Sequence, residues 1–277
     1  MNCEVVDPDV SRILSMAPAL NRFHRYLLVL THARSYSTLF CHILGSHPQI
    51  CGYNESKLAY EKITDFVKLN CLVHNAGNYR PESEYVLDKL IYDHFTVSDV
   101  VLSHARVMPI FILREPEAAI TSHTRMILRE HGEGLVDWGF VGYSPTFAIQ
   151  TAAEFYCRRL VNLQTIRERL ERLGNRGIFL ASESLMDETG LAFQLVERTL
   201  SLREPLRETY QLFEKTGVCG GGDTSPMIRT GHIVRKRTSD QERAVEIPPD
   251  VLDRARKLHN ECRASFQASP AVVQLTY

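Results

Sequence analysis

The sequence predicts a three-layer α/β fold, in which helices cover both faces of a central, mainly parallel β-sheet. Three short apolar runs, at 26–31, 108–113 and 178–181, have the length and composition of strands that are buried on both faces. Each run is followed by a segment whose apolar residues have helical spacing. Alternating buried strands and helices are typical of parallel sheets, because a parallel pair needs a long crossover connection.

The first half of the chain contains one clear unit of this kind. Its expected elements are, in chain order, a polar leader at 1–24 with at most one short helix, the strand at 26–31, a helix at 37–44 that Gly45 ends, a short strand at 49–52, a helix at 57–69, a loop at 70–84 and a segment at 85–91 that fits either a strand or a helix.

The second half contains two further units and a last helix. Its expected elements are the strand at 108–113, a helix from Pro116 to 131, a Gly-rich excursion at 132–146, a long amphipathic helix at 147–173, the strand at 178–181, a helix at 189–202, a Gly-rich and then basic segment at 216–237 and a helix at 249–266. No internal repeat or low-complexity tract interrupts this order, so we expect a single domain over 1–277.

Composition and charge exclude several classes of protein. The chain has 277 residues, of which 44% are hydrophobic, which is enough for a full core and excludes disorder as the main state. The net charge of −1 argues against nucleic acid or an anionic membrane surface as a partner. The N-terminal segment is acidic and lacks an apolar run, and the seven cysteines are widely spaced without a CxxC pair. We therefore expect reduced thiols and a cytoplasmic location.

The loop after the first strand has the features of an anion site. Residues 31–38 read Thr-His-Ala-Arg-Ser-Tyr-Ser-Thr and lead directly into a helix. Unpaired N–H groups at a helix start favour an anion, and Arg34 adds a fork of donors. The loop lacks the glycines and lysine of a Walker A motif, which weakens a kinase interpretation. The alternative is that Ser37 and Thr38 only cap the helix.

A second candidate anion site follows the second strand. Arg114 comes at the strand end, and Ser122 lies in the helix that Pro116 opens, where both could reach one phosphate. The alternative is a solvated arginine with an unrelated helix-surface serine.

These two segments resemble those of sulfotransferases that use 3′-phosphoadenosine-5′-phosphosulfate (PAPS). Arg34-Ser35-x-Ser37-Thr38-Leu39 with His47-Pro48 is similar to the 5′-phosphosulfate loop of the bacterial and tyrosylprotein branches, and LREPEAAITSH to the 3′-phosphate motif. The similarity covers about residues 26–202 and implies a P-loop-type three-layer fold. One departure is Tyr36, where the family usually has glycine, and a side chain there could crowd the phosphate or change the backbone angle. The resemblance assigns to the cosubstrate Arg34, Ser35, Tyr36, Ser37, Thr38, Arg114 and Ser122.

The same resemblance implies the catalytic residues. Sulfuryl transfer needs a base for the acceptor proton, cations for the leaving phosphate and in-line placement, and it needs no metal. Glu55 matches the glutamate base of the tyrosylprotein-like branch, and Lys89 the lysine at the bridging oxygen, with Arg34 assisting. The alternative for Glu55 is a glutamate in the first turn of a helix, and the alternative for Lys89 is a surface lysine. The cytosolic small-molecule branch has a histidine where this chain has Ile91, and four histidines are reserve bases or packed residues: His32, His94, His104 and His123.

Later segments resemble the family more weakly. A basic stretch at 229–237 suggests Arg235 and Lys236 as further nucleotide contacts, or else a solvated basic run. Glu183, in a segment similar to the family's YEDL, is expected to fix a neighbouring helix. We expect 132–146 and 203–237 to cover the substrate and nucleotide, with Trp138, Phe140 and Tyr143 as an acceptor wall or as core.

The expected activity is therefore PAPS-dependent sulfuryl transfer to the hydroxyl of a small-molecule or carrier-bound acceptor. The alternatives are a P-loop kinase-like phosphotransferase and a non-catalytic nucleotide-binding protein on the same fold. The sequence leaves the oligomeric state open, with a homodimer as one option.

Overall fold

A computed structural model describes residues 18–53, 55–132, 144–218, 223–235 and 245–275. Its centre is a six-stranded parallel sheet with the strand order β2-β3-β1-β4-β5-β6. The strands are β1 (Arg25–Thr31), β2 (Ile50–Cys51), β3 (Tyr85–Leu90), β4 (Val107–Leu113), β5 (Gly177–Ala181) and β6 (Val272–Val273). The predicted α/β class with a parallel sheet is confirmed.

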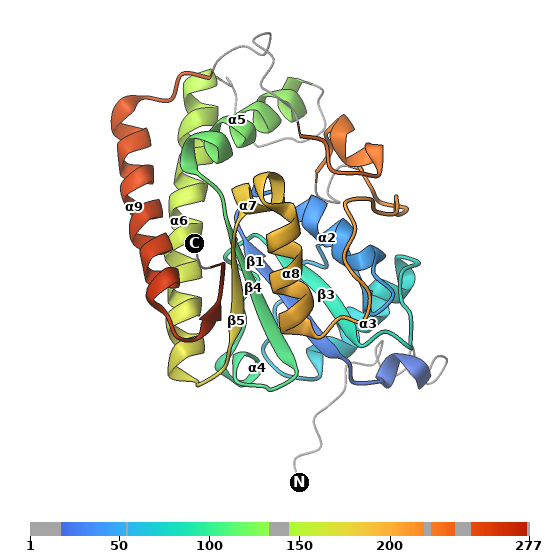
Figure 1. The fold of residues 1–277 in the computed structure, drawn as a ribbon. Coiled ribbons are helices and arrows are strands. Elements are labelled where there is room, and N and C mark those ends of the chain that lie inside the picture. Colours follow the sequence, from blue (N-terminus) through green and yellow to red (C-terminus); the bar gives the residue numbers. More distant parts are fainter. Residues whose placement is uncertain (1–17, 54, 133–143, 219–222, 236–244, 276–277) are drawn as a thin grey trace.

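Helices cover both faces of this sheet (Figure 1). They are η1 (Pro18–Asn21), α2 (Ser37–Ser46), α3 (Asp65–Asn75), α4 (Asp99–Leu102), α5 (Pro116–Gly132), α6 (Pro145–Arg172), α7 (Ser182–Asp187), α8 (Thr189–Leu200), η2 (Pro226–Thr230) and α9 (Pro249–Ala268). Among the described helices, none is long and apolar enough to cross a membrane.

Alternate residues of β1 divide the core into two parts. Leu27 and Val29 pack with apolar residues of α2 and α8 on one face. Leu28 and Leu30 pack with residues of α3, α5, α6 and α9 on the other. Burial on both faces explains why β1 is an unbroken apolar run, since every second side chain belongs to a different layer.

The two central strands feed helices on opposite faces. The apolar side chains of α2, which follows β1, belong to the first core, whereas those of α5, which follows β4, belong to the second. β1 and β4 are parallel neighbours, with Thr31 beside Ile112 near their carboxyl ends. In open α/β sheets such a divergence opens a crevice at the strand ends, where ligands bind. Both candidate anion loops begin at this crevice.

The expected helix at 57–69 is wrong at 57–64, and the expected loop at 70–84 is wrong at 70–75. The helix, α3, begins at Asp65 and continues to Asn75. Upstream, the Asp65 carboxylate accepts hydrogen bonds from the backbone N–H groups of Glu61 and Lys62 and holds the chain in a turn. Leu58 and Ile63 still pack against the core. They are apolar for that reason, and their spacing resembles that of a helix although the chain there is irregular.

Gly45 does not end the helix after β1, which continues to Ser46. A Cβ at this position would lie 2.3 Å from the Gly52 carbonyl oxygen. The residue therefore permits close packing of α2 against the chain after β2.

Other expected boundaries also move. The ambiguous segment at 85–91 is strand β3, which pairs with both β1 and β2. Gly132 belongs to α5 and Pro145 begins α6, so both ends of the predicted excursion are helical. Trp138, Phe140 and Tyr143 lie outside the described residues. The short elements α4 and β6 were not expected, because four- and two-residue segments carry no readable periodicity.

Candidate active site

A cavity of about 1280 Å³ opens at the carboxyl ends of the central strands. Its wall brings together ten of the residues selected from the sequence: Arg34, Ser35, Tyr36, Ser37, Thr38, Glu55, Lys89, Arg114, Ser122 and Arg235. Lys236 lies outside the described residues. Typical small-molecule sites have volumes of about 300–1,000 Å³, so this cavity has room for a nucleotide and a second ligand.

The loop between β1 and α2 is held in a strained conformation. Arg34 and Tyr36 both have left-handed backbone angles, with φ of 63° and 61°. For residues other than glycine this costs about 1–2 kcal/mol each. The Thr31 hydroxyl donates to the Ile112 carbonyl at 2.7 Å and lies 2.6 Å from Ser35 Oγ. The Ser35 hydroxyl is thus engaged within the loop, which it helps to fix.

Tyr36 takes the backbone conformation that a glycine would adopt there. Its side chain does not enter the loop but lies against Arg114, whose guanidinium carbon is 4.1 Å from the ring centre. Arg114 Nη2 also donates to the Tyr36 hydroxyl at 2.9 Å. The tyrosine therefore connects the two candidate anion loops, and the expected crowding of the phosphate does not follow from its position.

The alternative interpretation, in which Ser37 and Thr38 only cap the helix, is wrong. Helix α2 begins at Ser37, and its N-cap is Tyr36, whose side chain makes no capping hydrogen bond. The Thr38 hydroxyl instead accepts a hydrogen bond from Lys89 Nζ at 2.8 Å. The first N–H groups of a helix have no intrahelical acceptor, so this helix start can donate to an anion.

Lys89 and Glu55 form a buried ion pair at the cavity wall. Lys89 Nζ lies 2.9 Å from Glu55 Oε1, and the two side chains are 2% and 8% exposed. Burial lowers the pKa of Lys89, but the charge and hydrogen bond of Glu55, together with Cys41 and Asp223, raise it, and the net shift is upward. Lys89 is therefore a charged, buried group and not a surface lysine, and Glu55 lies well before the first residue of α3.

Arg34 links both candidate anion sites to an unexpected carboxylate. Its Nε donates to Ser122 Oγ at 3.0 Å, and its Nη1 donates to Asp223 Oδ1 at 2.7 Å. Burial opposes ionisation of Asp223, but the Arg34 charge and hydrogen bonds from Ser225 lower its pKa below the usual value. The Asp223 carboxylate thus forms an ion pair with Arg34, the arginine that the sequence assigns to the phosphosulfate.

Among the described residues, the Arg114 guanidinium donates hydrogen bonds to neutral groups only. Its guanidinium donates to the Arg34 carbonyl oxygen and the Tyr36 hydroxyl, and within the described residues it forms no ion pair. Its backbone N–H donates to His32 Nε2 at 3.0 Å. Burial lowers its pKa, as expected for a cation removed from water. The cavity wall therefore includes a partly desolvated arginine whose described hydrogen-bond partners are neutral.

Of the four reserve histidines, only His123 lines the cavity. His32 is fully buried between the two loops, where burial lowers its pKa to about 3, and its Nδ1 contacts the Ala33 carbonyl. It acts as a neutral bridge between the loops. His94 stacks on Tyr92, and His104 accepts a hydrogen bond from the Arg106 backbone.

Two later residues hold the cavity wall together. Arg235 donates to both carboxylate oxygens of Glu208 at 2.8 and 2.7 Å and also to the Thr189 hydroxyl. Its guanidinium is therefore already engaged at the rim. Glu183 Oε1 accepts the Glu115 backbone N–H at 3.1 Å, just before α5. This contact agrees with the expected helix-fixing role of Glu183.

Sequence reasoning missed two buried residues behind the site and one partly buried residue in the cavity wall. Arg159 of α6 donates to the carbonyls of Thr31 and Leu90, at the ends of β1 and β3, at 2.8 Å each. Asp88 accepts the Ser56 backbone N–H and so holds the chain beside Glu55. The third is Asp223. An arginine on an amphipathic stripe and an aspartate in a strand carry no sequence signal for these contacts, since the partners are distant in the chain.

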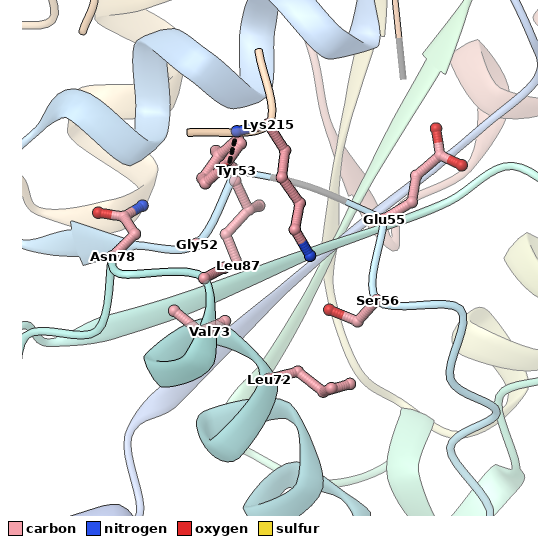
Figure 2. Close-up of a pocket in the computed structure, with 10 residues that line it drawn as sticks. Gly52, Tyr53, Glu55, Ser56, Leu72, Val73, Asn78, Leu87 and Lys215 are labelled. Carbon is pink, nitrogen blue, oxygen red and sulfur yellow. Dashed lines mark hydrogen bonds between the residues drawn. The ribbon is translucent and has the colours of Figure 1, made fainter. Parts of the chain in front are cut away.

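A smaller pocket of about 130 Å³ lies behind Glu55. Figure 2 shows Lys215 and Tyr53 on one side of it and Leu72 and Val73 on another, with the Glu55 carboxylate pointing away from these apolar side chains. This volume suits a few water molecules but not a nucleotide.

Within the described residues, no group of three or more His, Cys, Asp or Glu side chains could hold a metal ion. The chain matched no family model and no curated protein.

Proposed function

We propose that this protein transfers a sulfuryl group from PAPS to a hydroxyl of a small-molecule or carrier-bound acceptor. The observation that carries the proposal is the position of Lys89, whose ammonium contacts both Thr38 in the first turn of α2 and Glu55. A cation between an anion-binding helix start and a carboxylate suits a reaction in which a phosphate leaves while a proton is removed.

The nucleotide would span the two loops. Its 5′-phosphosulfate would lie at the start of α2, beside Arg34 and Thr38, and its 3′-phosphate at Arg114 and Ser122. Arg114 supports this placement because its guanidinium donates hydrogen bonds only to neutral groups among the described residues. Arg34 would exchange the Asp223 carboxylate for the cosubstrate's anion.

The transfer itself is an in-line displacement at sulfur. The acceptor oxygen attacks the sulfur, and the bond between sulfur and the bridging phosphate oxygen breaks. The acceptor proton passes to Glu55, and Lys89 and Arg34 stabilise the charge that remains on the departing adenosine 3′,5′-bisphosphate. General-base catalysis of this kind contributes about 10²–10⁴-fold.

The test uses ³⁵S-labelled PAPS with a panel of hydroxyl acceptors in EDTA, in parallel with γ-labelled ATP and magnesium. Release of adenosine 3′,5′-bisphosphate with label on an acceptor supports the proposal. Phosphate transfer from ATP would favour the kinase alternative, and nucleotide binding without any transfer the non-catalytic one. Lys89→Met is the matched negative control for transfer.

A further inference from the structure

The cavity has a second arm whose lining differs from that of the nucleotide loops. Away from the strand ends, its wall is formed mainly by apolar and aromatic side chains of α5, α6 and the segment after β3: Ile91, Tyr92, Met126, Ile127 and Phe155. Four residues add polar atoms to this wall: Thr121, Arg125, Glu130 and Thr151. The apolar and aromatic part of the wall suits an apolar skeleton better than a sugar, because that part offers few polar groups to replace bound water.

Aromatic rings give this arm a fixed shape. The rings of Phe155 and Tyr92 meet edge to face, with centroids 5.8 Å apart and an interplanar angle of 78°. The ring of His123 meets Phe155 in the same way, at 5.3 Å and 77°. Burial raises the pKa of Tyr92, and the charge of Glu55 adds to the rise. The row of rings and the proposed base thus line the same cavity.

His123 is the polar member of this row. It is 8% exposed, lines the cavity and follows Ser122 directly in α5. Its ring makes no hydrogen bond within the part of the chain that the structure describes. Burial, and secondarily the charge of Arg34, lowers its pKa to about 4. At neutral pH the ring is therefore uncharged, with one donor and one acceptor available to a ligand.

We propose that this arm binds the acceptor, that the acceptor carries its hydroxyl on an apolar skeleton about one or two rings in size, and that His123 hydrogen-bonds its oxygen-bearing end. The inference rests on the proposed sulfuryl transfer. A hydrogen bond between uncharged groups contributes about 0.5–1.5 kcal/mol, and the acceptor would form one with a ring nitrogen of His123. The rings would hold the skeleton, and His123 would orient it toward Glu55 and Lys89.

The test compares 2-naphthol and cyclohexanol with glucose as acceptors for PAPS, and also measures binding of each to protein saturated with adenosine 3′,5′-bisphosphate. His123→Phe keeps an aromatic ring but removes the hydrogen bond, His123→Gln retains a polar side chain, and His74→Phe on the exposed face of α3 is the matched control. For His123→Phe we expect KM for 2-naphthol to rise about tenfold, with unchanged nucleotide affinity. His123→Gln should recover part of this loss.

The proposed function and the acceptor assignment are overturned by different results. Protein that does not bind adenosine 3′,5′-bisphosphate would refute the proposed function. Protein that binds the nucleotide but prefers glucose, or binds neither apolar alcohol, would overturn the acceptor assignment alone. A His123→Phe variant that loses nucleotide affinity would place His123 in the nucleotide site and also overturn it.

Discussion

Lys89 Nζ and Glu55 Oε1 lie 2.9 Å apart, in side chains that are 2% and 8% exposed. A buried ion pair is a poor source of stability, because the cost of removing two charges from water offsets their attraction. This pair lies at the wall of the cavity of about 1280 Å³, and its ammonium also contacts Thr38 at the start of α2. Its position suits chemistry better than it suits stabilisation of the fold.

Glu55→Gln should lower turnover by at least about 100-fold, because an amide cannot accept the acceptor proton. Affinity for adenosine 3′,5′-bisphosphate should remain, since Glu55 touches no phosphate in the proposed arrangement. Steady-state kinetics with PAPS and calorimetric titration of the product measure the two effects. Glu154→Gln, on the exposed face of α6, is the control, and unchanged turnover in Glu55→Gln would show that another group is the base.

Arg114→Ala should weaken binding of adenosine 3′,5′-bisphosphate about 30-fold or more, which corresponds to about 2 kcal/mol, because a charged hydrogen-bond donor is lost. Adenosine 5′-phosphate, which lacks the 3′-phosphate, should lose much less. Arg106→Ala removes an exposed cation at the opposite end of the same strand and is the control. Equal losses for both nucleotides would disprove the assignment of Arg114 to the 3′-phosphate.

Asp223→Asn should tighten binding of adenosine 3′,5′-bisphosphate about tenfold, which corresponds to about 1.4 kcal/mol. The substitution removes a carboxylate that competes with the ligand for Arg34. Asp187→Asn removes a charge from the same cavity without touching Arg34 and should have a smaller effect. Weaker binding by Asp223→Asn would mean that this carboxylate holds Arg34 in its productive position.

The free energy of unfolding should fall as the pH drops from about 6.5 toward 4. Burial lowers the pKa of His32 to about 3 and of His42 and His123 to about 4, so below pH 6.5 the unfolded chain binds protons that the folded one does not. Each histidine then lowers the free energy of unfolding by about 1.4 kcal/mol for each pH unit. Asp88 opposes this between about pH 6 and 4, because burial raises its pKa to about 6 in the fold.

Urea unfolding at pH 7 and pH 5 measures this dependence. Three histidines outweigh one aspartate, so the protein should be less stable at pH 5. His42→Gln should reduce the difference, because it removes one of the three titrating groups. Equal stability at both pH values in the parent protein would contradict the assignment of buried, neutral histidines.

The fold was predictable where burial leaves a simple pattern. β1, β4 and β5 are buried on both faces and appear in the sequence as apolar runs, within one residue of their ends. The helix at 57–69 was wrong at 57–64 because Leu58 and Ile63 reach the core from irregular chain. The spacing of apolar residues alone does not distinguish a helix from irregular chain that packs against the core.

Candidate site residues on strand ends were predictable, and their partners were not. The topology of a parallel sheet brings the ends of β1 and β4 together, which explains why Arg34 and Arg114 share one cavity. The Asp223 contact to Arg34 and the Arg159 contact to Thr31 join positions that are far apart in the chain. No local pattern encodes such pairs.

Calorimetric titration of the parent protein with adenosine 3′,5′-bisphosphate, adenosine 5′-phosphate and ATP tests whether the two loops bind the nucleotide of PAPS. We predict tight binding of the bisphosphate in EDTA and at least about tenfold weaker binding of adenosine 5′-phosphate. Addition of magnesium should not raise the affinity for ATP. No binding of the bisphosphate, or preferred binding of magnesium-ATP, would contradict the account.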